Sequence, residues 1–326
     1  MRQPHILVVG SLNMDVVIEA DRAPRQGETV MGKHVHFIPG GKGANQAVAA
    51  ARLGARTTMI GAVGTDHFGA NLVGSLTRNG VDTHGVKAVS GVSTGIASIL
   101  LAHGDNQIVV VPGANAHCLP TDILQHAELF AGADVVLLQL EIPLETVCIA
   151  AETAKRFGKT VILNPAPAQR LPTALLQNVD YITPNRSELV LLAGLDPEAF
   201  ELEKAMEWVR GMGPRHVIAT LGSEGSAYLQ REGKITIVPA YKVPVVDTTG
   251  AGDAFNAGLA YALAAGSEIV DAVTFASKVS ALAVTKFGAQ TGMPTYGEVA
   301  AYDWSSLGLS DRPDGDMQGP ILSRER

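Results

Sequence analysis

The chain has 326 residues, 46% of them hydrophobic and 17% charged, which is enough to bury a large core. Its formal net charge of -7, without a basic cluster, argues against a general binder of nucleic acids or membrane surfaces. Two cysteines, Cys118 and Cys148, are too few for a disulfide framework, and no segment approaches the roughly 20 apolar residues of a membrane span. We therefore expect a soluble, cytoplasmic protein with one large α/β domain and an insertion.

The first predicted strand is the apolar run Ile6 to Val9, which ends at Gly10 and fits the centre of a parallel sheet. Ligands of open α/β sheets bind beyond the carboxyl ends of the strands, so we expect Asn13 and Asp15 at such an edge. Their amide and carboxylate suit the hydroxyl groups of a polar ligand. From these residues alone, an Asx-type turn is the better interpretation.

Two segments, Val16–Phe37 and Thr94–Val111, lack a helical period and contain short apolar or alternating runs broken by turn residues. We expect them to pair into one β-sheet lid, which would exclude water from a transferable phosphate. The predicted division is therefore an α/β core of residues 1–12, 40–90 and 113–310, a lid of residues 13–39 and 91–112, and a frayed polar tail of residues 311–326.

A glycine-rich stretch that starts at Gly40 precedes a small-residue helix, which we expect over residues 46–53. The glycines open space at the start of this helix, and Lys42 and Asn45 offer hydrogen-bond donors there. A flexible loop with a solvated lysine explains the same residues equally well.

The middle of the chain alternates strands and helices in α/β fashion, with strands expected over residues 134–141, 160–164, 180–183 and 216–220. Polar residues follow these strands. Asn185 and Glu188, three apart at a helix start, would lie on one side of its first turn, where oxygen ligands can hold hydrated Mg²⁺; the same pattern is typical of helix capping. Thr220 and Ser223 are suited to contact phosphates, although a tight turn explains them as well. A hairpin is expected over residues 226–230 and 235–238.

Near the C-terminus, a β-branched run over residues 243–246 predicts an edge-type strand, and residues 255–265 predict a buried helix. Between them lies a Gly-Ala-Gly turn at residues 250–252. The unpaired N–H groups at a helix start attract negative charge, so this turn is a candidate anion site. Asp253 beside it would accept a proton from an attacking hydroxyl, unless it only caps the helix. A last core helix is expected over residues 268–286.

The motifs Gly40-Gly-Lys-Gly-Ala-Asn-Gln-Ala47 and Asp247-Thr-Thr-Gly-Ala-Gly-Asp-Ala-Phe255 resemble the two signatures of the ribokinase family of sugar and nucleoside kinases. The resemblance extends from about Ile6 to about Gly292 and includes the segments 10–15, 139–141, 164–168 and 183–188. It implies a ribokinase-like three-layer α/β/α domain with a mainly parallel sheet and a small β lid. It also implies an ATP-dependent kinase, with D-ribose phosphorylated at O5 as the favoured reaction.

The resemblance further implies a role for each matching residue. Asp253 would be the general base, beside an anion hole made by Gly250, Ala251 and Gly252. The sugar would be held by Asn13, Asp15, Gly41, Lys42, Gly43, Asn45 and Glu141. ATP would contact Asn185, Thr220, Gly222, Ser223, Gly225, Gly252 and Ser277. Glu188 would act on Mg²⁺ through water. A monovalent cation, K⁺ in ribokinases, would lie against Asp247, Thr249 and backbone oxygens near Ala283, Lys286, Gly288 and Gly292.

Two of these positions depart from the family pattern. Thr249 and Ser277 stand where other or larger residues occur in the family, and the Ser277 difference puts the packing of adenine in doubt. The tail beyond Tyr302 has no counterpart in the resemblance.

Other functions remain open at this point. The acceptor could be 2-deoxyribose, fructose or a nucleoside such as adenosine, although Asn13 favours vicinal hydroxyls and Phe37 is the single aromatic residue of the predicted lid. A non-catalytic sugar-binding regulator would have no use for Asp253. A dinucleotide-dependent oxidoreductase lacks its Gly-x-Gly-x-x-Gly after the first strand. The exposed sheet edge of the lid predicts a homodimer.

Overall fold

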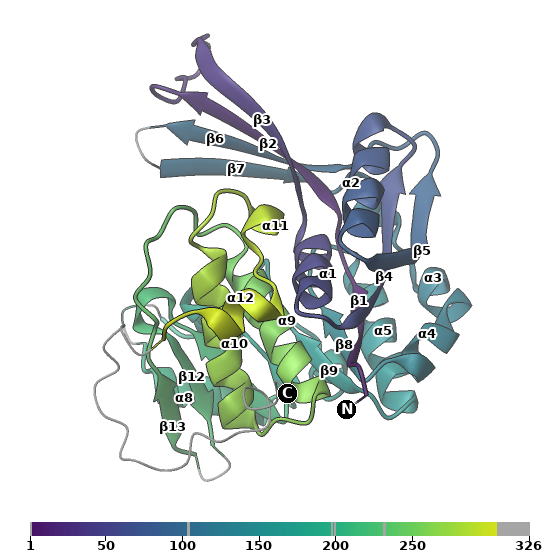
Figure 1. The fold of residues 1–326 in the computed structure, drawn as a ribbon, viewed down its shortest axis with the longest axis vertical. Coiled ribbons are helices and arrows are strands. Elements are labelled where there is room, and N and C mark those ends of the chain that lie inside the picture. The colour runs from purple at the N-terminus through teal and green to yellow at the C-terminus, as the bar shows by residue number, and fades with distance from the viewer. Residues whose placement is uncertain (1, 103–104, 197, 199, 231–232, 305–326) are drawn as a thin grey trace.

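The computed structural model describes residues 2–102, 105–196, 198, 200–230 and 233–304. The predicted tail, residues 311–326, lies outside the described residues. The central sheet is nine-stranded, in the order β13-β12-β11-β10-β9-β8-β1-β4-β5 (Figure 1). Its strands are β1 (His5–Val9), β4 (Arg56–Gly64), β5 (Val81–Val89), β8 (Val135–Leu138), β9 (Thr160–Leu163), β10 (Tyr181–Ile182), β11 (His216–Thr220), β12 (Ser226–Leu229) and β13 (Ile235–Val238).

Strand β1 lies in the middle of this sheet because it is apolar on both faces. It pairs in parallel with β4 and with β8. Ile6 and Val8 belong to one buried cluster, whereas Leu7 and Val9 belong to the other. Alternate side chains of a strand point to opposite faces, so both faces of the sheet must be covered by helices.

Helices cover the two faces as two separate layers. One layer contains α1 (Lys42–Arg52), α2 (His67–Arg78), α9 (Ala251–Ala264), α10 (Ile269–Ala283) and α12 (Tyr296–Ala301), with α11 (Ala289–Gly292) beside α1. The other layer contains α3 (Pro120–Gln125), α4 (Ala127–Gly132), α5 (Leu144–Arg156), α6 (Thr173–Leu176), α7 (Arg186–Ala193) and α8 (Leu202–Gly211). Two short 3₁₀ helices are η1 (Gly113–His117) and η3 (Gly222–Glu224). The predicted three-layer α/β/α fold is confirmed.

The sheet is parallel from β11 to β5 and ends in the predicted hairpin, where β11, β12 and β13 run antiparallel. The carboxyl ends of the parallel strands therefore lie along one edge of the sheet. This agrees with the prediction that the first strand belongs to a parallel sheet.

A second sheet has the order β3-β2-β6-β7 and is called the small sheet below. Its strands are β2 (Asn13–Ala20), β3 (Gly32–Gly40), β6 (Gly95–Ala102) and β7 (Asp105–Val111). Strands β2 and β6 pair in parallel although they are far apart in the chain, so the two predicted β segments do form one sheet. Figure 1 shows this sheet projecting from the core above α11. The division of the chain into core, lid and tail stays a prediction.

The local predictions for three segments were wrong. Residues 243–246 do not form a strand. Pro244 has no N–H to donate, Val245 and Val246 are 63% and 60% exposed, and the Val246 N–H bonds Val284 O at 2.8 Å, outside any ladder. The two glycine-rich helices also begin earlier than expected, at Lys42 and Ala251. Their glycines therefore lie at and inside the first turns and not in loops before them.

Candidate active site

The start of α1 lies directly against the end of β1 and the start of β2. Gly41 is the N-cap of α1, with φ 91°, and a Cβ at this residue would lie 2.6 Å from Asn13 N. A Cβ at Gly43 would lie 2.6 Å from the backbone of Gly10 and Ser11. Only glycine allows this approach. The first turn of α1, with Lys42 and Asn45, is thereby held at the carboxyl edge of the sheet, while Gly43 packs against backbone.

Asp253 lies in the first turn of α9 and faces α1. Its Oδ2 accepts a hydrogen bond from Asn45 Nδ2 at 3.0 Å, and its Oδ1 accepts one from Gln46 Nε2 at 3.1 Å. The N-cap of α9 is Gly250, with φ 80°, and no side chain caps this helix. The interpretation of Asp253 as a simple helix cap is therefore wrong, and its buried carboxylate is oriented by two amides from another helix.

Glu141, which follows β8, accepts hydrogen bonds from three donors. Its Oε2 accepts from Ser11 Oγ at 2.6 Å, from Asn13 Nδ2 at 3.3 Å and from Lys42 N at 3.3 Å. Asn13, Lys42 and Glu141 are thus brought together as the sequence predicted, although they come from three separate elements.

Lys42 is surrounded by four carboxylates. Burial opposes its charge, but Asp253, Glu141, Glu188 and Asp15 together raise its pKa. The same environment raises the pKa of Asp15 to about 7, chiefly through burial and then through Glu141 and Asp253. A lysine in this position can neutralise negative charge on either side of the cluster.

Burial is also the main reason why the pKa of Asp253 is raised, while Lys42, Asn45 and Gln46 act in the opposite direction. A carboxylate of raised pKa accepts a proton more readily than an exposed one, which suits a general base. The geometry and the electrostatics of Asp253 therefore agree on the same chemical role.

Several buried polar residues of this cluster were not singled out from the sequence. Gln46 donates to Asp253 and to Asn164 Oδ1, at 3.3 Å, and its Oε1 accepts from Gln139 Nε2 at 2.6 Å. Asn115 accepts from Leu12 N and donates to Asn13 Oδ1 at 2.7 Å. Gln46, Gln139 and Asn164 lay inside matched family segments, which was the available signal. Asn115 lies more than 100 residues from Asn13, and no local pattern indicated it.

Two oxygens of the cluster still lack a partner. Among the described residues, the buried Oδ1 of Asn45 and the buried Oε1 of Gln139 accept no hydrogen bond. A buried unpaired acceptor is costly unless a ligand supplies the donor, and Asn45 Oδ1, on the residue that binds Asp253, is suited to a ligand hydroxyl.

Asn185, which follows β10, and Thr220, the last residue of β11, lie side by side and form an isolated parallel bridge. Gly222 and Ser223 belong to η3, and a Cβ at Gly222 would meet open space. Gly225 has a structural role, because a Cβ there would lie 2.1 Å from Val238 O. The Ser277 hydroxyl donates to Val273 O at 2.9 Å and lies 3.2 Å from Ser226 Oγ, so it is engaged inside the protein.

Glu188 and Asn185 form a reciprocal capping box at the start of α7. Glu188 Oε2 accepts from Asn185 N at 2.8 Å, and Asn185 Oδ1 accepts from Glu188 N at 2.9 Å. The capping interpretation of this pair is confirmed. Glu188 nevertheless interacts electrostatically with Lys42 and Asp253, and burial raises its pKa, so it lies in the same charge cluster.

Two consecutive hydrogen bonds connect the first turn of α9 to Thr183, which follows β10. Thr183 Oγ1 donates to Asn256 Oδ1 at 2.6 Å, and Asn256 Nδ2 donates to Gly252 O at 2.8 Å. Ala251 N already bonds Thr248 O at 3.2 Å, whereas a Cβ at Gly252 would meet open space. Of the two glycines in the predicted anion hole, Gly252 therefore has more room for a ligand than Gly250.

The residues of the predicted cation loop also converge. Asp247 accepts from Thr249 N and from Gly288 N, both at 2.9 Å, which joins the two halves of the loop. A Cβ at Gly292 would lie 2.4 Å from Ala283 O and 3.6 Å from Lys286 O, so these carbonyl oxygens point toward one place. Gly288 O already accepts from Gly292 N and from Thr291 Oγ1. The carbonyls of Ala283 and Lys286 fit a monovalent cation better than that of Gly288.

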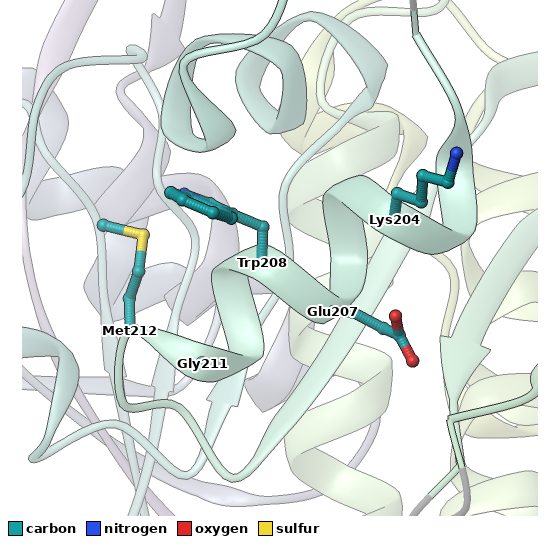
Figure 2. Close-up of a pocket in the computed structure, with 5 residues that line it drawn as sticks. All are labelled: Lys204, Glu207, Trp208, Gly211 and Met212. Atoms are coloured by element: carbon teal, nitrogen blue, oxygen red, sulfur yellow. The ribbon is translucent and has the colours of Figure 1, made fainter.

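A surface hollow lies far from these groups, on α8. It is lined by Lys204, Glu207, Trp208, Gly211 and Met212, and Figure 2 shows Glu207 pointing away from Trp208 and Met212. All five belong to one helix or follow it directly, and none matches a predicted site residue. Within the described part of the chain, no helix combines the length and apolar character needed to cross a membrane.

Comparison with known proteins shows which family the chain matches. A model of the pfkB family of carbohydrate kinases matches residues 3–296. The chain is 44% identical over 295 residues to a ribokinase of Bacillus subtilis, covering 90% of this chain and 98% of the relative. It is 35% identical over 300 residues to a deoxyribokinase of Salmonella typhi, covering 91% and 98%. The structure of an Arabidopsis thaliana ribokinase complexed with ribose and ATP has a TM-score of 0.85 and 35% identity, covering 91% and 98%.

Proposed function

The chain belongs to the pfkB family of carbohydrate kinases, and from this premise we propose that it transfers the γ-phosphoryl group of ATP to O5 of D-ribose. The observation that supports this most directly is the buried carboxylate of Asp253, held by Asn45 and Gln46 at the N-terminus of α9. A base and a helix N-terminus lie together there, as phosphoryl transfer to a hydroxyl requires.

The sugar would lie between Asp253 and the Glu141 cluster. Asp253 would take the proton of the attacking hydroxyl, and the unpaired Oδ1 of Asn45 would accept from a sugar hydroxyl. Asn13, Asp15 and Glu141 would fix the remaining hydroxyls, while Gly41 and Gly43 permit α1 to lie close enough for these contacts. The role of holding the sugar in line is thereby divided between α1, β2 and α9.

The phosphate chain would lie along the other side of Lys42, toward Asn185, Thr220, Gly222 and Ser223. Developing charge on the transferred group would be met by Lys42 and by the N–H groups at the start of α9. Mg²⁺, which neutralises phosphate charge when bound, would be approached through water by Glu188, whose Oε2 is already engaged by Asn185 N. K⁺ would bind the carbonyls of Ala283 and Lys286 beside Asp247 and stiffen the anion hole.

Ribose is favoured over 2-deoxyribose by the amide of Asn13. Its Oδ1 accepts from Asn115 and its Nδ2 donates to Glu141, which fixes the orientation of the amide in a buried position. Glu141 takes one of the two Nδ2 protons, so the second proton is available for a ligand hydroxyl, and a ligand without that hydroxyl would leave it unpaired. The second candidate acceptor is 2-deoxyribose, since a deoxyribokinase shares much of the sequence.

The test is an ATP-to-ADP assay with ribose, 2-deoxyribose, fructose and adenosine, with and without K⁺. Ribose should give the highest kcat/KM. Asp253→Asn should lower kcat by about 10²–10⁴ and keep ATP binding, because it removes the proton acceptor but keeps the shape of the side chain. Asp271→Asn, at an exposed position of α10, serves as the matched control. Near-normal turnover of Asp253→Asn would refute the mechanism, and higher kcat/KM with another acceptor would refute ribose.

The exposed small sheet supports a homodimer. Phe37, Ile108 and Val109 are 55%, 53% and 65% exposed, although large apolar side chains in sheets are normally covered. A second copy of this sheet is the simplest cover, and it would close the site in the cytoplasm, where we place the reaction. A monomeric mass in solution, by light scattering across a concentration series, would contradict the dimer.

A further inference from the structure

We propose that His84, His126 and Glu128 form a binding site for a transition-metal dication such as Zn²⁺, separate from the kinase site. His84 is on β5, His126 joins α3 to α4, and Glu128 is in the first turn of α4. One ligand atom from each of the three lies within 4.8 Å of the other two. Figure 1 shows β5 and these two helices on the same side of the molecule.

The donor set determines which ion would bind. Two imidazole nitrogens and one carboxylate oxygen are typical ligands of Zn²⁺, whereas Mg²⁺ prefers oxygen ligands and several waters. The site would therefore leave Mg²⁺ free for ATP. A tetrahedral centre with three protein ligands keeps its fourth position for water.

One distance between these ligand atoms is close to the value that a bound ion needs, and the others are within 4.8 Å. His126 Nδ1 lies 3.7 Å from Glu128 Oε1, and ligand bonds of about 2.0–2.2 Å in a tetrahedral site place neighbouring ligand atoms roughly 3.3 Å apart. The side chains of His84, His126 and Glu128 are 51%, 28% and 68% exposed. Side-chain rotation would close the remaining distance from separations of up to 4.8 Å.

Asp82 supplies the outer partner that metal-binding histidines usually have. Its Oδ1 lies 2.7 Å from His84 Nδ1 and also accepts from His84 N at 3.1 Å. This hydrogen bond places a proton on Nδ1 and leaves Nε2 as the metal-binding nitrogen. The carboxylate therefore selects a tautomer whose Nε2 can bind a metal.

The two elements that carry the ligands are already joined next to the site. Lys87 of β5 forms an ion pair with Asp122 of α3, with Nζ to oxygen distances of 2.6 and 2.8 Å. The backbone on both sides of His126 is also fixed, because its N–H bonds Asp122 O and its carbonyl accepts from Leu129 N. The metal would therefore add a second connection between β5 and the segment that contains α3 and α4, next to the ion pair of Lys87 and Asp122.

Chelator-treated full-length protein without nucleotide tests the proposal, since it does not depend on kinase activity. Calorimetric titration with Zn²⁺ should show a site that is lost in His84→Ala and in His126→Ala, and that Asp82→Asn weakens by about 10–100-fold. Co²⁺ should give the visible absorption of a tetrahedral centre in the parent protein alone.

His67→Ala is the matched control, because His67 is an exposed histidine on α2 outside the cluster, and it should bind Zn²⁺ as the parent protein does. Equal affinity of the parent protein and the His84→Ala/His126→Ala double variant would overturn the proposal and place the ion elsewhere, for example at the acidic cluster around Lys42. Absence of Zn²⁺ binding to the parent protein would also overturn it.

Discussion

Gln46→Leu should show how much the hydrogen bond from Gln46 contributes to catalysis by Asp253, because the variant keeps Asp253 and removes this bond to it. Gln46 is fully buried, and its amide donates to Asp253 Oδ1 at 3.1 Å and to Asn164 Oδ1 at 3.3 Å. Leucine fills a similar volume but donates nothing. Asp253 keeps the hydrogen bond from Asn45 and loses the other, so its carboxylate remains in place with less stabilisation of its charged form.

The size of the effect follows from that single hydrogen bond. A hydrogen bond to a charged group contributes about 1.5–3 kcal/mol, and one pKa unit corresponds to about 1.4 kcal/mol. The pKa of Asp253, which burial already raises and Gln46 lowers, should therefore rise further. Since the base must be ionised to act, the acid limb of the kcat/KM profile should move to higher pH, and a hydrogen bond of this strength corresponds to a movement of about 1–2 pH units.

The assay is the pH profile of kcat/KM with ribose at saturating ATP. Gln139→Leu is the matched control, because it removes a buried amide that bonds Gln46 Oε1 but does not bond Asp253. Both variants leave buried polar partners unpaired and should lose about 1–3 kcal/mol of unfolding free energy for each one. An acid limb that coincides in Gln46→Leu and the parent protein, or that moves equally in both variants, would refute the reasoning.

Three further predictions use the same site. Burial raises the folded-state pKa of Asp15 to about 7 from an ordinary 3.8, so between these values the unfolded chain releases this proton while the folded protein keeps it, and the folded protein loses stability as the pH rises. Asp15→Asn removes this loss and should raise the unfolding free energy at pH 8 by up to about 4 kcal/mol, with no difference near pH 3. It should also impair sugar binding, and urea unfolding and KM are the measurements. Gly43→Ala should lower the unfolding free energy by about 1–3 kcal/mol or more, because its Cβ would overpack the backbone of Gly10. Gly252→Ala places its Cβ in open space, so this variant should keep its stability and lose activity. Equal thermal stability of the two variants would contradict this prediction. Glu188→Gln preserves the capping box, so the melting temperature should stay while KM for Mg-ATP rises, and an unchanged KM would remove Glu188 from the Mg²⁺ assignment.

Elements with a strong local pattern were predictable. The apolar run of β1, the hairpin of β12 and β13, and the pairing of the two β segments in the small sheet all followed from residue order. The failures have local causes too. Residues 243–246 are β-branched, but Pro244 and the exposed valines prevent a ladder, and the starts of α1 and α9 contain glycines whose low helix propensity is overridden by tertiary packing.

The candidate site was predictable in its residue types but not in its contacts. Lys42, Glu141 and Asp253 could be named because they lie at strand ends or helix starts inside the matched motifs. Asn115 could not be named from the sequence. Its contact with Asn13 joins segments about 100 residues apart, and no periodic pattern in the sequence indicates such a contact. Gln46 could not be assigned to Asp253 either, since which face of α1 meets α9 depends on how both helices pack on the sheet.

The sequence by itself therefore determined the chemistry that is available: a carboxylate beside a Gly-Ala-Gly turn, a lysine in a glycine-rich stretch, and polar residues at the carboxyl ends of parallel strands. Only the tertiary structure decided how that chemistry is tuned. The pKa of Asp253 depends on its burial, on Lys42 and on two amides of α1, more than 200 residues away in the chain. Burial and electrostatic interaction depend on distance in space, and distance along the chain does not specify either.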